Sequence, residues 1–445
     1  MNKRIVTALI GVTLALTVAG VTVAASADDA ETADRPKYGT DGNGNPETGD
    51  CTVSTDEDPQ SAVDDAADGD VVCVKPGDHS DSTLNVDNAV TVRANGIVKL
   101  RNIVVSGDGA TIDGFTVVGD ELDDPSTGIK FSGTGHEIVN NLVNGKHIHY
   151  AIACDADECA SDVLISRNSV TQTNNFGVYL WGGSDITVEW NNIYDLWSDE
   201  GNDDVDGMRI WGTGHLIRNN YIHDLNVNKG EGEPHADCIQ NYQHSSRTDE
   251  SYGVTVENNY CVRVSGQCLI MQNEHRPSAD VRDYTFRGNV CESFGSQNIE
   301  LGSVTGGTIE NNILCGGVDG HVITFHSTVD GLETTDIKLR NNILATAGGS
   351  VFADGSKEAL IDDTDNIEVT DPTIADDWEE FEGNPDAPVL AINPDDFTVF
   401  RDRSQLAGDI IDEGSQPNSS DFHEDVDGAA RVRGATIDIG PFEFA

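Results

Sequence analysis

The chain has 445 residues, of which 46 are glycine and 37 % are hydrophobic. This hydrophobic content excludes a disordered protein and allows a long core. The net charge is −52, from 78 acidic and 26 basic residues spread along the chain. Spread acidity repels nucleic acid and anionic membranes, so neither is expected as a partner. It indicates either a surface adapted to high salt, where screening removes the self-repulsion, or a set of calcium sites.

The first 27 residues have the features of a secretory signal peptide. Lys3 and Arg4 precede an uncharged, largely apolar run over 5–24, and three small residues end the segment before an acidic pair. An uncleaved anchor is the alternative, because this run is nearly long enough to span a bilayer. No second apolar run of that length occurs, so we expect a secreted, soluble monomer with a polar linker over residues 28–50.

An asparagine returns once per segment of roughly 20 to 40 residues, the period of a solenoid. The residue two positions after each one is apolar or cysteine. Such a column can hydrogen-bond from coil to coil while the apolar neighbour points into the core. Matching Gly-Thr-Gly-His turns at His136 and His215 indicate structural histidines. The repeating asparagines are Asn141, Asn168, Asn191, Asn220, Asn259, Asn289, Asn312 and Asn342.

Short runs that alternate apolar and polar residues lie between these asparagines, and helical periodicity is weak. Examples are 177–180, 207–210 and 298–301, each with the period of two that is typical of strands. The sequence therefore predicts an all-β fold, a right-handed parallel β-helix (solenoid) over residues 51–365. The remaining segment, 366–445, is expected to close the β-helix and pack along it.

Nine cysteines in an exported protein are expected to be largely paired. Cys51 with Cys73, and Cys154 with Cys159, are plausible local disulfides. Two further pairs are separated by 30 residues, the same displacement as Asn259 to Asn289, which would place each pair in neighbouring coils. Those coils are about 4.8 Å apart, within reach of a disulfide, although parallel Cβ vectors are not ideal. The pairs are Cys238 with Cys268 and Cys261 with Cys291, and Cys315 is the expected odd thiol.

The C-terminus resembles the closing segment of secreted, pectate-lyase-like right-handed parallel β-helix proteins. The resemblance rests on residues 396–399 (DFTV), 404–415 (SQLAGDIIDEGS), 425–428 (DVDG) and 438–443 (DIGPFE), with Arg431 and Gly434 between them. It implies a β-helix architecture. It does not imply one activity, because such tails follow β-helices of several polysaccharide lyase and hydrolase families.

Aligning the coils gives three columns of residues on one face of the β-helix, two of them outward. The columns appear when five equivalent residues of successive coils are set level, namely Gly177, Gly207, Cys238, Cys268 and Asn298. The first column is Tyr179, Arg209, Gln240, Ile270 and Glu300. The second is Trp181, Trp211, Tyr242 and Gln272. Immediately before the strands come Asp206, Asp237, Gln267 and Gln297.

These columns predict a site at which Asp206, Arg209, His235 and Asp237 converge on one outward face. Trp181 and Trp211 would form a flat platform for a sugar ring, since exposed aromatic patches usually mark binding. The alternatives are turn-capping aspartates and ordinary surface aromatics. Asp203 and Asp204, together with Asp206 and Asp237, have the ligand type of a Ca²⁺ cage. The expected substrate-binding residues are Tyr179, Trp181, Trp211, Gln240, Tyr242 and Glu300.

Three functions fit this site, and a lyase of uronic-acid polymers is favoured. In that reaction Ca²⁺ neutralises the substrate carboxylate while Arg209, or more easily His235, removes the neighbouring proton. The run 234–237 (PHAD) also distantly resembles a signature of β-helix mannuronan epimerases, which begin with the same proton abstraction. A glycoside hydrolase using Asp206 and Asp237 is the second candidate. A non-catalytic glycan-binding or surface-attachment solenoid is the third.

Overall fold

The computed structural model describes residues 50–56, 58–119, 127–154, 159–198, 204–225, 235–243, 250–274, 281–293, 297–316, 321–346 and 350–370. The predicted signal peptide, nearly all of the linker and the segment after residue 370 lie outside these ranges. Within them, no helix is both long enough and apolar enough to cross a membrane.

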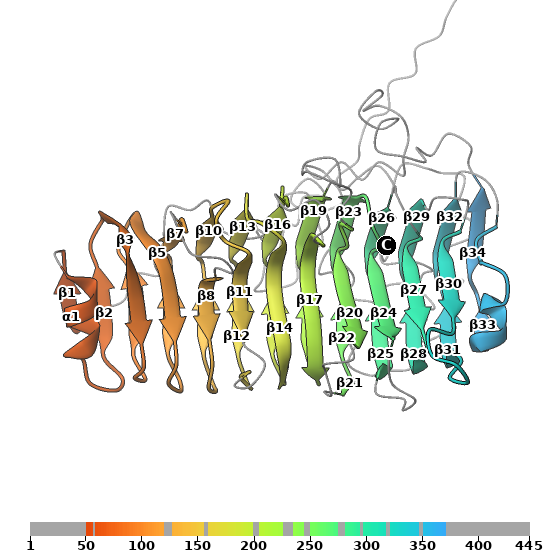
Figure 1. The fold of residues 1–445 in the computed structure, drawn as a ribbon, viewed down its shortest axis with the longest axis horizontal. Coiled ribbons are helices and arrows are strands. Elements are labelled where there is room, and N and C mark those ends of the chain that lie inside the picture. Colours follow the sequence, from red (N-terminus) through yellow and green to blue (C-terminus); the bar gives the residue numbers. More distant parts are fainter. Residues whose placement is uncertain are drawn as a thin grey trace, which may run out of the picture. The chain divides into compact units, whose positions relative to one another are not determined.

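The described residues form a stack of coils whose strands pair in parallel with the coils before and after (Figure 1). The all-β parallel β-helix predicted from the sequence is confirmed. Three walls run along the stack. The site wall consists of β8 (Thr127–Phe131), β11 (Tyr150–Cys154), β14 (Phe176–Ser184), β17 (Asp206–Thr213), β20 (Ile239–Gln243), β24 (Leu269–Asn273), β27 (Ile299–Gly302) and β30 (Ile323–His326).

The second wall follows the site wall in each coil. It consists of β1 (Val53–Thr55), β2 (Val71–Val74), β4 (Thr91–Ala94), β6 (Thr111–Asp113), β9 (Glu137–Val139), β12 (Leu164–Ser166), β15 (Thr187–Glu189), β18 (Leu216–Arg218), β22 (Thr255–Glu257), β25 (Val281–Arg287), β28 (Thr305–Glu310), β31 (Thr335–Arg340) and β33 (Leu360–Thr364).

The third wall completes each coil. It consists of β7 (Thr116–Val117), β10 (Leu142–Asn144), β13 (Ser169–Thr171), β16 (Asn192–Tyr194), β19 (Tyr221–Leu225), β23 (Tyr260–Val264), β26 (Val290–Ser293), β29 (Ile313–Gly316), β32 (Ile343–Thr346) and β34 (Ile367–Thr370). The other elements are β3 (Gly77–Val86), β5 (Val98–Val105), β21 (Ser251–Tyr252), helix α1 (Pro59–Asp64) and the 3₁₀ helix η3 (Ser356–Ala359).

The predicted asparagine column is a continuous hydrogen-bonded ladder between the second and third walls. The Oδ1 atom of Asn168 accepts from the backbone nitrogen of Asn141 at 2.9 Å and from its Nδ2 at 3.0 Å. The same pair of bonds recurs at every step and continues beyond the predicted column, where Asn366 accepts from Asn342. The eight predicted asparagines are 0–2 % exposed. Because a buried polar group without a partner costs about 1–3 kcal/mol, the ladder enforces the register of the coils.

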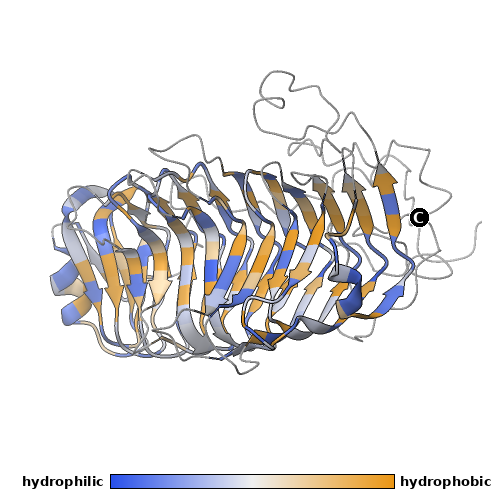
Figure 2. Cartoon of the chain, turned by 45° about the vertical axis from the view of Figure 1, so that its right-hand side comes forward, coloured by the Kyte–Doolittle hydropathy of each residue, from blue (hydrophilic) through white to orange (hydrophobic). Residues whose placement is uncertain are grey.

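Apolar residues fill the interior between the three walls. Val143, Val170, Ile193 and Ile222, each two residues after a ladder asparagine, are paired from coil to coil and completely buried. Hydrophobic residues recur on strand after strand (Figure 2). His136 and His215 are buried as expected, since each accepts a backbone N–H and contacts a carbonyl of its own turn.

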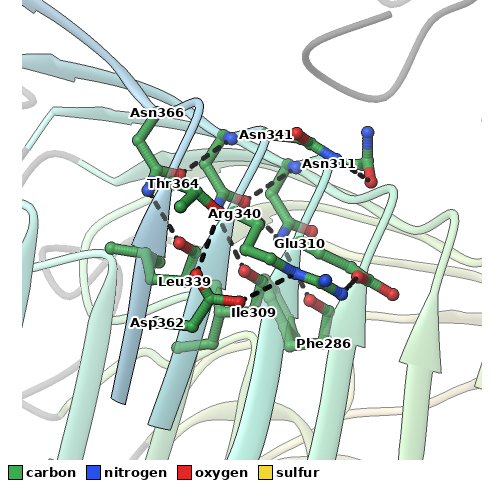
Figure 3. Close-up of polar contacts among 12 residues, drawn as sticks. Phe286, Ile309, Glu310, Asn311, Leu339, Arg340, Asn341, Asp362, Thr364 and Asn366 are labelled. Carbon is green, nitrogen blue, oxygen red and sulfur yellow. Dashed lines mark hydrogen bonds and ion pairs between the residues drawn. The ribbon is translucent and has the colours of Figure 1, made fainter. Parts of the chain in front are cut away.

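The second wall carries an alternating ladder of acidic and basic residues. Each acid lies level with an arginine on the next coil, and the ion pairs Glu189–Arg218, Glu257–Arg287 and Glu310–Arg340 have separations of 2.7, 2.6 and 2.5 Å. The last pair lies beside Asp362 in Figure 3. The full order along the wall is Glu189, Arg218, Glu257, Arg287, Glu310 and Arg340.

Two of the predicted disulfides are confirmed, and the two predicted pairings of stacked cysteines, Cys238 with Cys268 and Cys261 with Cys291, are wrong. Cys51 bonds Cys73, and Cys154 bonds Cys159. Cys238 bonds Cys261 and not Cys268. Cys268, Cys291 and Cys315 are buried thiols outside these disulfides.

The predicted stacking itself is correct. Ile239 pairs with Leu269, which sets the preceding Cys238 and Cys268 in neighbouring coils, and Cys261 pairs directly with Cys291. Stacked residues extend their Cβ atoms in parallel, however, whereas Cys238 and Cys261 approach each other across the core from two different walls. Their Cα atoms are 6.1 Å apart, within the usual range for a disulfide.

Candidate functional site

The site wall aligns the outward residues as the sequence predicts. Tyr179 pairs with Arg209, Arg209 with Gln240, Gln240 with Ile270, and Ile270 with Glu300. The column also extends toward the N-terminus through Ala153 to Lys130. Trp181 pairs with Trp211, and Tyr242 with Gln272. The two outward columns therefore form one continuous face along the stack.

A buried charged cluster lies at β17 and β20 and contains Asp204, Asp206, Arg209, Asp237 and Gln240. The guanidinium of Arg209 donates from Nε to Asp206 at 2.7 Å and from Nη2 to Asp204 at 2.5 Å, and it also contacts the Gln240 side-chain oxygen. Asp237 accepts from the backbone nitrogen of Gln267. Both Asp206 and Asp237 are completely buried, although the sequence placed them on an outward face.

Two aspartates of this cluster, Asp206 and Asp237, have raised pKa values. Burial raises the pKa of Asp206 well above its ordinary value; Arg209 opposes this shift and Asp237 adds to it. Burial likewise raises the pKa of Asp237 to about 7, against the effect of the Gln267 N–H. Within the described part of the chain, Asp206 Oδ1 and Asp237 Oδ2 have no hydrogen-bond partner. Each carboxyl therefore has an oxygen that a proton or a ligand can satisfy.

Arg209, in contrast to the two aspartates, is held in its charged form. Burial lowers its pKa, but the carboxyls of Asp206 and Asp204 outweigh burial and raise it above the ordinary value. The guanidinium also lies over the rings of Phe176 and Tyr242, at 4.5 and 5.1 Å from their centroids. Arg209 is therefore a permanently charged, fixed group.

The aromatic platform differs from the prediction. Trp211 is only 1 % exposed, because its ring packs edge-on against Tyr179 and Tyr242 and its Nε1 donates to the Tyr242 carbonyl at 2.6 Å. Tyr179 is also buried, which leaves Trp181 and Tyr242 partly accessible. Outward direction did not ensure exposure here, since large neighbouring rings cover one another.

A cavity of about 250 Å³ opens beside these rings over β8, β11 and β14. Tyr150, Tyr179 and Trp181 line it together with the cation Lys130. Lys130 and Tyr150 were not among the predicted site residues, although extending the column by two coils from Tyr179 leads directly to Lys130. Aromatic walls with one fixed charge are a common construction of a ligand site.

A second polar centre lies further along the same face, around Glu300. Its carboxylate accepts from the side-chain amides of Gln267, Gln272 and Gln297 at 2.6–2.7 Å, and His326 Nε2 lies 3.1 Å away. Burial opposes ionisation, but the contacts with His326 and the amides lower the pKa of Glu300. The His326 side chain is 38 % exposed. His326 was not among the predicted site residues, although it occupies the Trp181 column two coils beyond Gln272.

The remaining predicted residues lie near the cluster or outside the described chain. His235 is exposed, and its carbonyl accepts from the backbone nitrogen of Val205. Asp203 falls outside the described residues. Among those that are described, no three or more histidine, cysteine, aspartate or glutamate side chains are grouped so as to hold a metal ion.

The chain matches no family model and no curated protein in sequence. Solved structures are similar in fold. The A-module of the mannuronan C-5 epimerase AlgE6 from Azotobacter vinelandii gives a TM-score of 0.52 at 14 % identity, over 75 % of this chain and 93 % of that one. The PL6 family polysaccharide lyase Pedsa3628 from Pseudopedobacter saltans gives 0.46 at 15 %, over 73 % and 93 %. Pectate lyase Pel9A gives 0.44 at 14 %, over 86 % and 90 %. At these identities the similarity shows the fold alone.

Proposed function

We propose that this chain is a secreted carbohydrate-active enzyme that cleaves a uronic-acid-containing polysaccharide by β-elimination. One continuous face carries an aromatic cavity with Lys130, the permanent cation Arg209 and the titratable acid Asp237. Similarity to the fold of a protein named as a mannuronan epimerase supports a polysaccharide substrate. The disulfides fit the oxidising surroundings of an exported protein.

The raised pKa values of Asp206 and Asp237 favour elimination over hydrolysis at this pair. A glycosidase needs one ionised carboxylate, either as nucleophile or as general base. Burial instead favours the neutral form of both groups. Elimination needs an acid for the leaving oxygen and a cation beside the substrate carboxylate. Asp237, with a pKa of about 7, suits the first task near neutral pH, and Arg209 suits the second.

The base is assigned to His235. Arg209 does not fit that role because its neighbours hold its proton. The exposed His235 lies two residues before Asp237, and its carbonyl accepts from Val205, which lies between Asp204 and Asp206 in the chain. His326, in contact with Glu300, lies on β30, four coils from Arg209 on β17. At about 4.8 Å per coil this distance is roughly 19 Å, so His326 is assigned to a sugar further along the same polymer.

Calcium does not fit the described carboxyls as a cage of their own. Arg209 lies against both Asp204 and Asp206, where a dication would otherwise sit. Calcium binding by Asp203, Asp204, Asp206 and Asp237 remains a hypothesis that a chelator can test. No step of the reaction proposed above passes through the ion.

The test is incubation with a panel of acidic and neutral polysaccharides, with and without chelator, at several salt concentrations. Unsaturated products from an acidic polymer are expected. New reducing ends without unsaturation would replace the lyase with a hydrolase. Tight binding to a glycan without any product would support the third candidate, a non-catalytic binding solenoid.

Single substitutions then assign the roles on the polymer that is cleaved. His235→Ala is expected to reduce kcat at least 100-fold, the usual contribution of general acid–base catalysis. His326→Ala should instead raise KM with kcat largely kept. His79→Ala, on β3 and away from the face, is the matched control. Loss of kcat in His326→Ala but not in His235→Ala would move the base to the Glu300–His326 pair.

A further inference from the structure

Four cysteines lie within two neighbouring coils directly beneath the candidate site. Cys238 immediately follows Asp237, and Cys268 immediately follows Gln267, at the inner side of the site wall. Cys261 and Cys291 lie level with each other on the third wall. All four are at most 3 % exposed and belong to the same apolar core.

The disulfide-bonded pair and the two free cysteines occupy equivalent positions in successive coils. Cys238 and Cys261 form a disulfide across the core with a sequence separation of 23. Moving both by one coil, 30 residues, gives Cys268 and Cys291, whose separation is also 291 − 268 = 23. The strand pairings Ile239–Leu269 and Cys261–Cys291 keep the two walls in the same register over this step.

The Cys268 thiol already faces the third wall. Its Sγ donates to the carbonyl of Cys261 at 3.7 Å, and the Cys291 thiol is its hydrogen-bonding neighbour. We infer that Cys268 and Cys291 form a fourth disulfide, stacked one coil above Cys238–Cys261. It links the segment just before β24, which carries Gln267, to the third wall.

Formation of this bond requires an oxidant. The two thiols release two protons and two electrons as the S–S bond forms, and an external disulfide, such as oxidised glutathione or an exchange catalyst, is reduced to two thiols. Burial and the neighbouring Cys291 raise the pKa of Cys268, so the folded chain holds it as a thiol. Thiolate is the reactive form. The bond therefore forms during folding in an oxidising compartment, or through local opening of the two coils.

The bond would fix a residue that joins the two polar centres of the site. The backbone nitrogen of Gln267 donates to Asp237, and its side chain donates to Glu300. A covalent link at the adjacent Cys268 therefore restrains both contacts, and reduction relaxes them together.

The experiment is disulfide mapping of the full chain exported into an oxidising compartment, alkylated in denaturant before non-reducing digestion. A peptide joining Cys268 to Cys291 is expected beside the other three disulfides, with one alkylated cysteine, Cys315, per chain. Cys315→Ser should abolish that label and keep all bonds. Three alkylated cysteines, persisting after equilibration with oxidised glutathione in mild denaturant, would overturn the inference. So would peptides joining Cys238 to Cys268 or Cys261 to Cys291.

Cys268→Ser and Cys291→Ser provide the second measurement. Each should leave its former partner alkylated, and the two variants should lower Tm by similar amounts because each removes the same bond. If both variants have the wild-type Tm and labelling pattern apart from the lost thiol, no bond existed between them.

Discussion

The second wall and the site wall both bury charged side chains, but they treat them differently. On the second wall Glu189, Glu257 and Glu310 each lie level with an arginine in the next coil, as in Glu310–Arg340, whose side chains are 1 % and 8 % exposed. Among the described residues of the site wall, Arg209 pairs with both Asp204 and Asp206, while Asp237 has no cation in hydrogen-bonding contact. The same coil geometry thus supports paired charges where only stability is needed and unsatisfied acids where chemistry is proposed.

Removing one member of a second-wall pair should produce the largest loss of stability. Glu310→Ala removes the carboxylate that lies 2.5 Å from the buried Arg340 guanidinium, whereas Asp362 is 3.9 Å away. Loss of one partner of a buried ion pair typically costs about 3–5 kcal/mol. Urea unfolding measures this free energy. A loss below about 1 kcal/mol would mean that the pair is solvated and the contrast between the walls is wrong.

Neutralising an acid of the site wall should instead increase the free energy of unfolding at neutral pH. The folded pKa of Asp237 is about 7, above the unfolded value near 4, so the folded state binds the extra proton. Stability linked to this group is complete below pH 4 and is lost as the pH rises toward 7, by up to about 4 kcal/mol. Asp237→Asn should remove this loss.

The measurement is urea unfolding of wild type and Asp237→Asn at pH 4, 5.5 and 8. The difference between them should grow with pH in favour of the variant. Glu310→Gln on the second wall is the matched control, and it should be destabilised at pH 8. A pH-independent difference for Asp237→Asn would show that this carboxyl is ionised in the folded state. Turnover of Asp237→Asn should fall because the leaving oxygen loses its acid.

A smaller effect is expected at the aromatic cavity. Lys130→Ala removes the cation of that cavity without touching Asp237 or His235. On an acidic polymer KM should rise about tenfold, equivalent to about 1.4 kcal/mol, with kcat unchanged. Lys99→Ala, whose side chain is 45 % exposed on β5, is the control. An unchanged KM would remove the cavity from the substrate path.

Added salt should change the contribution of the surface charges to stability, but not that of the buried charges of the two walls. The net charge of −52 destabilises the folded chain through self-repulsion, which screening reduces. Stability is therefore expected to rise between 0.1 M and 1 M NaCl. The Glu310→Ala loss should stay constant within about 0.5 kcal/mol, because buried pairs are screened much less. A loss that shrinks with salt would place that pair in solvent.

The coil geometry could be predicted well from the sequence because a single repeating residue marks the same position in every coil. The asparagine column gave the register, and the register gave the neighbours of Arg209, including Tyr179 and Gln240. The same alignment could have reached Lys130 and His326 had it been carried to the outer coils. The buried environment of Asp206 could not be read in this way, because exposure depends on how large side chains of adjacent coils cover one another.

The disulfide error has a similar origin. Equal displacement correctly placed Cys238 over the position of Cys268, but it reports only on contacts along the stack. The bond to Cys261 runs across the core between two walls. The width of that core depends on every side chain that fills it, and a linear repeat contains no measure of it.

Because of the asparagine ladder, the position of a coil in the stack does not depend on the number of residues in the coil. Successive ladder residues are separated by 27, 23, 29, 39, 30, 23 and 30 residues, yet each step has nearly the same bond lengths. Extra residues between two asparagines therefore leave the next coil where it was. A coil can in principle be deleted, duplicated or exchanged with that of another solenoid, provided that the cut is made from one ladder asparagine to the next.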